Sequence, residues 1–231
     1  MLTERYSQEF VRSHLIPRAE WRPFPPAGDR AAWTHLLDHP LNRERRAYIV
    51  GQAEAVLEGC PWPQLPATLF MEFFRNGNRS RYEGPYFRRR RNLASLVLGE
   101  CFEREGRFPA HARNPGDPLP SQEWEAVDLF AAETAMVLSE ALYLVGDDVA
   151  SVSAAAVDRV RREVQRRVIL PVETRDDFSW FSGHNNWTPW CASNVLGAAM
   201  YVLEDEGRLA ALAHRLMGIV DRFIAGYGPD G

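Results

Sequence analysis

The stretch that decides the fold is SQEWEAVDLFAAETAMVLSEALYLVGDDVASVSAAAVDRVRREVQRRVILP, residues 121–171. Its first half carries apolar residues at helical spacing: Trp124, Val127, Ala131, Leu138, Leu142 and Val145. Ser121 is a suitable N-cap, acidic residues follow it in the first turn, and Gly146 is a suitable terminator. We therefore predict a helix from Ser121 to Gly146.

The second half of this stretch predicts a partner helix. Its apolar stripe is flanked by arginines and consists of Val149, Val152, Ala156, Val160, Val164 and Val168. Pro171 is expected to stop it, because proline cannot donate a helical hydrogen bond. The short link Gly146–Asp148 predicts an antiparallel helical hairpin, in which the two aspartates act as a helix cap and not as a catalytic pair.

Further helices are expected on both sides of this hairpin. Thr188 and Pro189 predict the start of a helix that ends at Gly207, and the next helix carries Leu209, Leu212, Leu216, Val220 and Phe223. Earlier segments with helical patterns are residues 41–57 and 86–105, and no stretch has the alternation typical of strands. The sequence predicts an all-α chain of antiparallel hairpins, with residues 1–231 forming a single domain.

The composition disfavours some classes of function. The 231 residues are 45% apolar and carry a net charge of −4, which disfavours a generic nucleic-acid binder. All 27 basic residues are arginine. Cys60, Cys101 and Cys191 have no metal-site spacing, so we expect buried free thiols, no metal and no cofactor. No secretory signal or membrane span is evident, so we expect a cytoplasmic protein; a periplasmic location stays open if the start is not native.

One segment departs from helical propensity, the stretch DDFSWFSGHNNWTPWCASN at residues 176–194. It places three tryptophans around His184, Asn185 and Asn186, directly before a helix start. Aromatic rings stack on sugar faces, amides bond hydroxyls and carboxylates, and a helix N-terminus favours an anion. This pattern is typical of a saccharide-binding cleft. The alternative is that the tryptophans are core residues and both asparagines are turn residues.

Three motifs, in this order, resemble the α-helical toroid of the heparinase II/III family of polysaccharide lyases. They are YEGPYFRRRRNLASLVLGECFEREGRF at 82–108, AVDLFAAETAMVLSEALYLVGDD at 126–148, and GHNNWTPWCASNVL at 183–196. The resemblance covers most of the chain from about Arg79 to Gly231. It implies an incomplete (α/α) toroid of antiparallel helical hairpins, as the N-terminal part of a larger lyase-like protein.

The resemblance also implies a reaction, β-elimination at a uronic acid in an acidic polysaccharide or oligosaccharide. A lyase of this kind first neutralises the uronate carboxylate, and a tyrosine then removes the adjacent proton. Asn185 or Asn186 would be the neutraliser, with His184 as its neighbour or substitute. Side chains that would form the substrate subsites are Trp180, Trp187, Trp190 and His111. The family's catalytic tyrosine and β-sandwich domain are expected beyond Gly231, so this chain alone should bind weakly without lyase activity.

Two other functional classes compete with the lyase. One is a non-catalytic helical module that binds a carbohydrate or a protein through the same aromatic cleft. The other is a helical scaffold without a ligand, in which the NNW segment is closed and packed in the core. No tyrosine of this chain lies in the family's catalytic motif. The sequence leaves open the polysaccharide, the choice between Asn185 and Asn186, and the oligomeric state.

Overall fold

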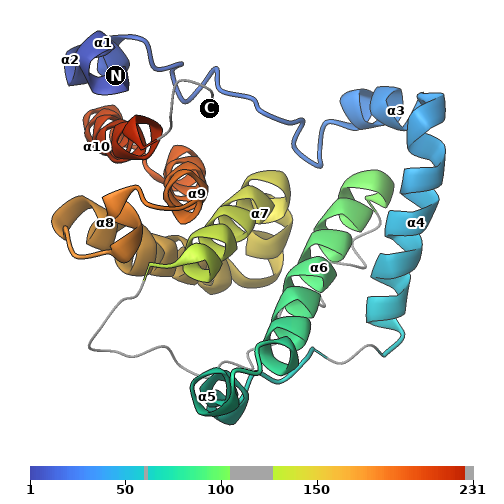
Figure 1. Cartoon of the computed structure of the whole chain (residues 1–231). Helices are drawn as coiled ribbons and strands as arrows, with labels where there is room; N and C mark the ends of the chain where they lie inside the picture. The colour runs from blue at the N-terminus through green and yellow to red at the C-terminus, as the bar shows by residue number, and fades with distance from the viewer. Residues whose placement is uncertain (60–61, 105–126, 227–231) are drawn as a thin grey trace. The chain divides into compact units, whose positions relative to one another are not determined.

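The computed structural model describes residues 1–59, 62–104 and 127–226. In these residues helices are the main regular structure and no strand is present, which confirms the all-α class (Figure 1). The residues of the chain group into two compact units. Unit 1 comprises Met1–Pro23, Glu123–Glu140 and Asp158–Gly231, and unit 2 comprises Phe24–Gln122 and Ala141–Val157. The predicted single domain over residues 1–231 stays a prediction.

Unit 2 is built on two long helices, α4 (Pro40–Leu57) and α6 (Ser80–Glu103), which pack against each other. Two shorter helices, α3 (Arg30–Asp38) and α5 (Ala67–Asn76), also pack on α6. The predicted helix at 41–57 is therefore confirmed. The predicted helix at 86–105 begins earlier, at Ser80, and includes Pro85. The proline-rich residues between Trp21 and Asp29 lie outside helices, as expected for a loop.

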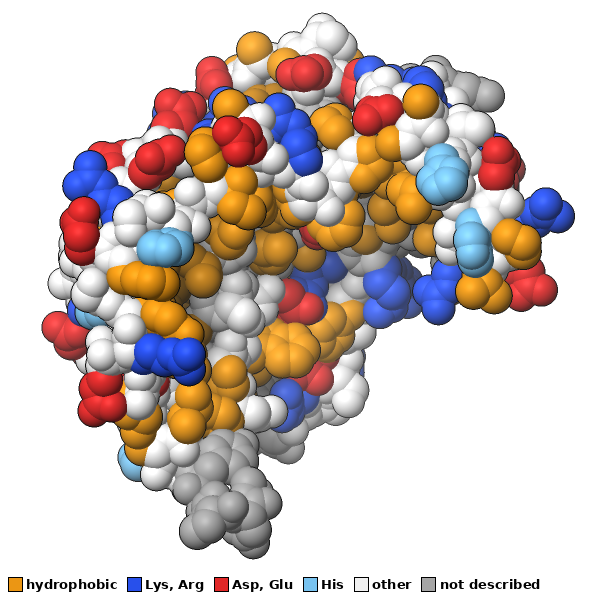
Figure 2. All heavy atoms as spheres, turned by 90° about the horizontal axis from the view of Figure 1, so that it is seen from above, with side chains coloured by type: hydrophobic (Ala, Val, Ile, Leu, Met, Phe, Trp, Pro, Cys, Tyr) orange, Lys and Arg blue, Asp and Glu red, His pale blue; other side chains and the backbone are white. Residues whose placement is uncertain are grey.

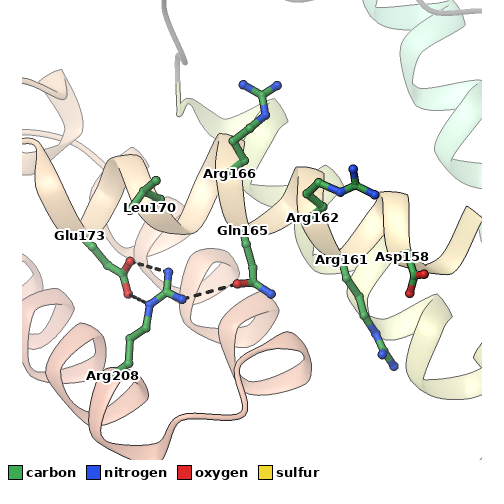
Figure 3. A pocket seen from close by; sticks show the side chains of 8 residues that line it. All are labelled: Asp158, Arg161, Arg162, Gln165, Arg166, Leu170, Glu173 and Arg208. Atoms are coloured by element: carbon green, nitrogen blue, oxygen red, sulfur yellow. Dashed lines mark hydrogen bonds and ion pairs between the residues drawn. The ribbon is translucent and has the colours of Figure 1, made fainter. Parts of the chain in front are cut away.

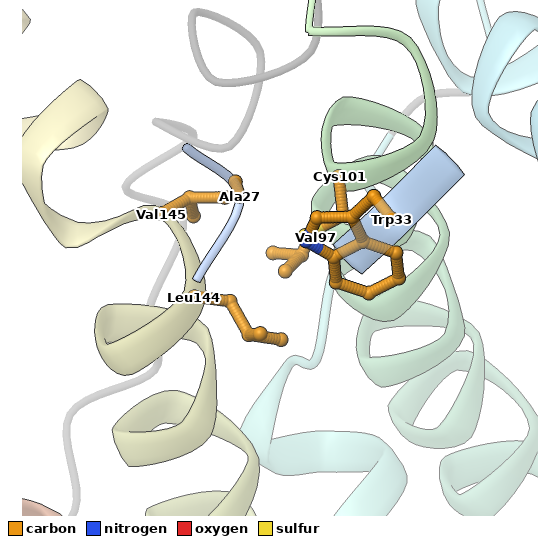
Figure 4. Close-up of a cluster of buried hydrophobic side chains, with 6 residues drawn as sticks. All are labelled: Ala27, Trp33, Val97, Cys101, Leu144 and Val145. Carbon is orange, nitrogen blue, oxygen red and sulfur yellow. The ribbon is translucent and has the colours of Figure 1, made fainter. Parts of the chain in front are cut away.

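A buried apolar cluster holds this unit together (Figure 4). Its members come from three separate stretches of the chain and are Ala27, Trp33, Val97, Cys101, Leu144 and Val145. The loop that carries Ala27 is fixed because its N–H donates to the Leu144 carbonyl, and the Trp33 indole donates to Pro26. Two polar interactions border the cluster, an ion pair between Arg104 and Asp148 and a Tyr143 hydroxyl that donates to the Phe24 carbonyl.

The predicted first hairpin falls in α7 (Leu129–Val164), which begins at the N-cap Asp128. The predicted N-cap Ser121 lies outside the described residues. Two helices meet within α7, where Val145 and Ser153 leave helical dihedral angles, so the break predicted at Gly146 is close to an observed one. By contrast, Pro171 does not end the helix. The chain continues as a π-helical turn (Gln165–Ile169) into α8 (Leu170–Thr174).

Unit 1 is organised around α9 (Trp187–Val202) and α10 (Glu206–Ala225), which pack against each other. The boundaries predicted here were wrong by a few residues. Asn185 accepts a hydrogen bond from the Trp187 N–H, so α9 begins before Thr188, whose hydroxyl instead donates to the Trp180 carbonyl. Asp205 caps α10 through the Arg208 N–H. Gly207 therefore lies in the first turn of α10 and does not terminate α9.

The N-terminal helices α1 (Leu2–Arg5) and α2 (Gln8–Ser13) pack on α10. The Asp221 carboxylate of α10 accepts from the N–H groups of Leu2 and Thr3, at 2.6 and 2.8 Å. Cys101 and Cys191 are free and buried, as predicted, whereas Cys60 lies outside the described residues. These contacts give unit 1 a continuous helical framework beneath the residues discussed below.

The surface carries charges of both signs. Figure 2 shows arginine and acidic side chains interspersed over one face, together with exposed apolar side chains. In the described part of the chain, one helical stretch, Leu129–Thr174, is long and apolar enough to cross a membrane by length and composition, with a hydropathy of 1.4. Core helices pass the same test, so this observation is weak and the expected absence of a membrane span stays a prediction.

Candidate functional site

The segment between α8 and α9 is a short, tightly held loop. It contains a 3-10 turn (Ser179–Ser182) followed by Gly183, whose φ is 81°. A Cβ atom on Gly183 would lie 2.7 Å from the Phe223 nitrogen of α10 and 2.8 Å from the carbonyl carbon of Arg222. Only glycine fits a backbone approach this close in this conformation. The loop is thereby pressed against the C-terminal end of α10.

Three hydrogen bonds fix the loop to its surroundings. The Trp180 indole N–H donates to the Val127 carbonyl at 2.7 Å, and Arg222 Nε donates to the Phe181 carbonyl at 2.8 Å. The Thr188 hydroxyl donates to the Trp180 carbonyl at 2.5 Å. Buried backbone carbonyls thus have partners on three different elements, and the conformation of the loop is specified from several directions.

A pocket of about 280 Å³ opens where the loop meets α10. The residues that line it are Gly183, His184, Asn185, Asn186, Phe223 and Gly226. The three polar side chains named at the outset, His184, Asn185 and Asn186, are exposed and lie together in this one hollow. Sequence reasoning did not identify Phe223 and Gly226, since Phe223 belongs to a regular apolar stripe and carries no distinguishing signal.

Asn185 has a defined orientation. Its Oδ1 accepts the Trp187 N–H at 2.9 Å, which leaves the Nδ2 amine as the free donor. Asn186 is the N-cap residue of α9, but its side chain makes no capping hydrogen bond. The side-chain amides of Asn185 and Asn186 therefore keep hydrogen-bonding capacity at the N-terminus of α9.

The backbone at this helix start supplies few donors itself. Trp187 N–H is taken by Asn185, Trp190 N–H bonds to the Asn186 carbonyl, and Pro189 has no N–H. What remains is the positive end of the dipole of a 16-residue helix. A bound anion would consequently need the side chains for direct hydrogen bonds and would gain from the helix only a favourable potential.

The predicted tryptophans fall into two groups. Trp187 and Trp190 are 38% and 47% exposed, and their spacing of three places them on neighbouring positions of the α9 surface. Trp180 is 3% exposed and packs on Phe178 and Phe181, so it supports the loop from the core. An arginine also lies here, because Arg222 precedes Phe223 and bonds the loop. His111, the remaining predicted site residue, lies outside the described residues.

The buried groups beneath this surface are not reactive at neutral pH. Burial raises the pKa of the Cys191 thiol to about 12, and nearby Asp128 adds to the effect. Burial also raises the pKa of Asp128, whose carboxylate accepts from the Ala131 N–H at the start of α7. The described part of the chain contains no cluster of ligands that could hold a metal ion. The pocket offers hydrogen-bond donors, and the exposed rings of Trp187 and Trp190 on α9 lie outside its lining. Such donors serve binding of a polar or anionic ligand.

Comparison with known proteins adds no further assignment. No family matches this sequence, and no curated protein matches it either.

Proposed function

We propose that this chain is the helical portion of a polysaccharide lyase, an incomplete α/α toroid that acts on uronic-acid-containing saccharides in the intact enzyme. The observation that supports it best is the gathering of His184, Asn185 and Asn186 in one pocket at the start of α9. In this proposal the pocket holds the carboxylate of a uronate residue.

The chemistry of elimination explains why such a pocket matters. The proton next to an ionised carboxylate is very weakly acidic, because its removal places a second negative charge on the same group. Hydrogen-bond donors that hold the carboxylate stabilise that developing charge. The Nδ2 groups of Asn185 and Asn186 are donors of this kind, and the dipole of α9 favours negative charge at the same place.

The exposed rings of Trp187 and Trp190 support a saccharide as the ligand. Both indoles keep more than a third of their surface open to solvent, although burial of aromatic surface is normally favourable. Pyranose rings have an apolar face that stacks on such indoles. A carboxylate held in the pocket, with sugar rings stacked along the adjoining turn of α9, would satisfy both groups of residues.

The proposed base is not among the residues that line the pocket. In the described part of unit 1 the tyrosines are Tyr6 and Tyr201, and neither lines the hollow. Tyr201 is buried and packs against Trp21. Tyr227 lies outside the described residues. This favours, as the second candidate, a carbohydrate-binding module that lacks catalysis, and we expect this chain alone to bind without eliminating.

Variants of the two asparagines test the proposal. Asn185→Ala and Asn186→Ala should each weaken binding of an oligogalacturonate about tenfold, since a hydrogen bond to a charged group contributes roughly 1.5–3 kcal/mol. Isothermal titration measures this loss. Asn76→Ala is a matched control, because Asn76 Oδ1 accepts from the N–H two residues later, as Asn185 does, and lies outside the pocket.

The outcomes separate the candidate functions. Loss of uronate binding in both pocket variants, with the control unchanged, supports the proposal. If the intact enzyme also forms an unsaturated uronate, detected by its ultraviolet absorbance, the lyase is favoured over the binding module. Equal uronate affinity in all variants would refute both.

A further inference from the structure

A second and larger hollow lies in unit 1, away from the pocket at His184. Its volume is about 830 Å³, and its walls include Arg161, Arg162, Gln165, Arg166, Leu170 and Arg208 (Figure 3). Arg208 is in the first turn of α10, whereas the His184 pocket contacts the other end of that helix. Arg208 and Phe223 are 15 residues apart along α10, or about 22 Å. We call this hollow the arginine groove.

The π-helical turn shapes the groove, and Pro171 accounts for the turn. Proline has no N–H and its ring clashes with the carbonyl four residues earlier, here that of Arg167. The chain widens instead, so that the Leu170 N–H bonds the Gln165 carbonyl. Leu170 and Glu173, which follow the turn, line the groove together with Arg162 and Gln165. Such wide turns recur at functional sites.

Most carboxylates around the groove are already paired. Glu173 accepts both Nε and Nη2 of Arg208 at 2.8 Å, and this partner raises the pKa of Arg208. Glu163 is shared by three guanidinium groups, those of Arg159, Arg166 and Arg167. The hydrogen bond from Arg167 is the main reason that the pKa of Glu163 is lowered. Of the described residues, Asp158 is the one other carboxylate in the lining.

After these pairings, unpaired positive charge remains in the lining of the groove. Arg161 and Arg162 are exposed and have no hydrogen bond or ion pair with any residue that the structure describes. Figure 3 shows Arg162 and Arg166 pointing to one side of the helix and Arg161 to the other, where Arg208 of α10 reaches towards Glu173 and Gln165. A ligand lying over this helix meets guanidinium groups on both sides. The chain as a whole is negative, so this local excess is not a consequence of overall composition.

We propose that the arginine groove binds carboxylate or sulfate groups of an acidic oligosaccharide, as an anchoring site distinct from the His184 pocket. The identity of this ligand rests on the proposed function. Planar guanidinium groups bind such anions through two parallel hydrogen bonds. The two adjacent cations Arg161 and Arg162, and the volume of the groove, fit a chain with several anionic groups better than one small ion.

A nucleic acid fits these observations less well. Single-stranded nucleic acids are held by aromatic rings on which the bases stack, and among the described residues no aromatic side chain lines the groove. The net charge of −4 also disfavours long-range attraction of a polyanion such as duplex DNA. An oligosaccharide requires only the local cations. It would be retained by the groove, and its far end would then be available to the pocket.

The test is binding of an oligogalacturonate decasaccharide and of the disaccharide to the full chain. The double variant Arg161→Gln/Arg162→Gln should bind the decasaccharide about tenfold more weakly and with a smaller salt dependence, because surface charges are screened by salt. Its affinity for the disaccharide in the pocket should not change. Arg45→Gln/Arg46→Gln is the matched control, since these adjacent arginines of α4 are also exposed.

Each outcome bears on one proposal. Unchanged decasaccharide binding in the groove variant, with loss in the asparagine variants, overturns the groove and leaves the pocket. Loss in the groove variant, with unchanged binding in Asn185→Ala and Asn186→Ala, supports the groove and refutes the pocket. Equal loss in the Arg45/Arg46 control means that net charge alone is responsible and overturns the groove. Tighter binding of a single-stranded oligonucleotide through Arg161 and Arg162 overturns the saccharide assignment.

Discussion

Gly183 lies against Phe223 so closely that a Cβ atom on the glycine would stand 2.7 Å from the Phe223 backbone nitrogen. The two residues are far apart in sequence, yet they form adjoining walls of the same pocket. The absence of a side chain at Gly183 is what allows His184, Asn185 and Asn186 to reach the end of α10. The geometry of the candidate site therefore depends on this one contact.

Replacing this glycine should damage both stability and binding. In Gly183→Ala the new Cβ clashes with backbone atoms of α10, and the φ of 81° is unfavourable for alanine. We expect a loss of about 1–3 kcal/mol in the free energy of unfolding, the usual range for strained backbone positions. Chemical denaturation measures it, and uronate affinity should fall in the same variant.

Gly51→Ala provides the control for this prediction. Gly51 lies inside α4, and a Cβ there meets no atom within 4 Å. Alanine is the better helix former by about 1 kcal/mol, so this change should be neutral or stabilising. If Gly183→Ala unfolds at the same denaturant concentration as the parent chain, the described approach of the loop to α10 is wrong.

Asp221 should make the attachment of the N-terminal helices sensitive to acid. Burial raises the pKa of its carboxyl, but hydrogen bonds from Thr3 and Leu2 outweigh this and hold the pKa below the ordinary value of 3.8. A group with a lowered folded-state pKa stabilises the fold above its unfolded-state pKa and loses that effect as pH falls through the folded value. The stabilisation is complete at neutral pH, begins to decrease near pH 4, and is lost as the pH falls through the folded-state pKa.

The variant Asp221→Asn tests this linkage. It should unfold about 1–3 kcal/mol more easily at pH 7, because one amide oxygen cannot satisfy the donors of Leu2 and Thr3. The difference from the parent chain should shrink as the pH is lowered below 4, where the native carboxyl takes up a proton. Asp38→Asn, at an exposed aspartate, should have little effect. A difference that grows in acid would contradict the assignment.

The two described thiols should resist modification in the folded chain. Burial raises the pKa of both Cys101 and Cys191 to about 12, so almost no thiolate is present at pH 8. Alkylation followed by peptide mass spectrometry should label both residues only after unfolding. Rapid labelling of either one in the native state would show that its helix is not packed as described.

The sequence was informative wherever apolar periodicity was long. The helix predicted at 41–57 matches α4 (Pro40–Leu57), although α4 buries only Ala53 and Val56. The last helix, α10, buries the predicted stripe at Leu212 and Leu216. The predicted helix boundaries were wrong where a side-chain hydrogen bond sets the first residue of the helix. α9 starts before Thr188, where Asn185 Oδ1 accepts the Trp187 N–H, and the Asp205 cap places Gly207 in α10 instead of at the end of α9.

Other features depend on contacts between distant residues and could not be predicted. The short α1 is held by Asp221, more than 200 residues away, and has no pattern of its own. At Pro171 the expected termination is replaced by a π turn, because packing of the following residues, including buried Val172, favours continuation. Similarly, composition identified the cluster at His184, but only the fold showed that Phe223 completes its pocket and that Trp180 is buried.

The central claim, that the His184 pocket binds a uronate carboxylate, is tested most directly by nuclear magnetic resonance. The side-chain amide signals of Asn185 and Asn186 are followed while galacturonate oligosaccharide or its neutral galactose counterpart is added. We predict shifts in these two amides and in backbone signals of Gly183 and Phe223, with the acidic sugar alone. Unchanged asparagine amides at saturating uronate, or equal shifts with the neutral sugar, would contradict the claim.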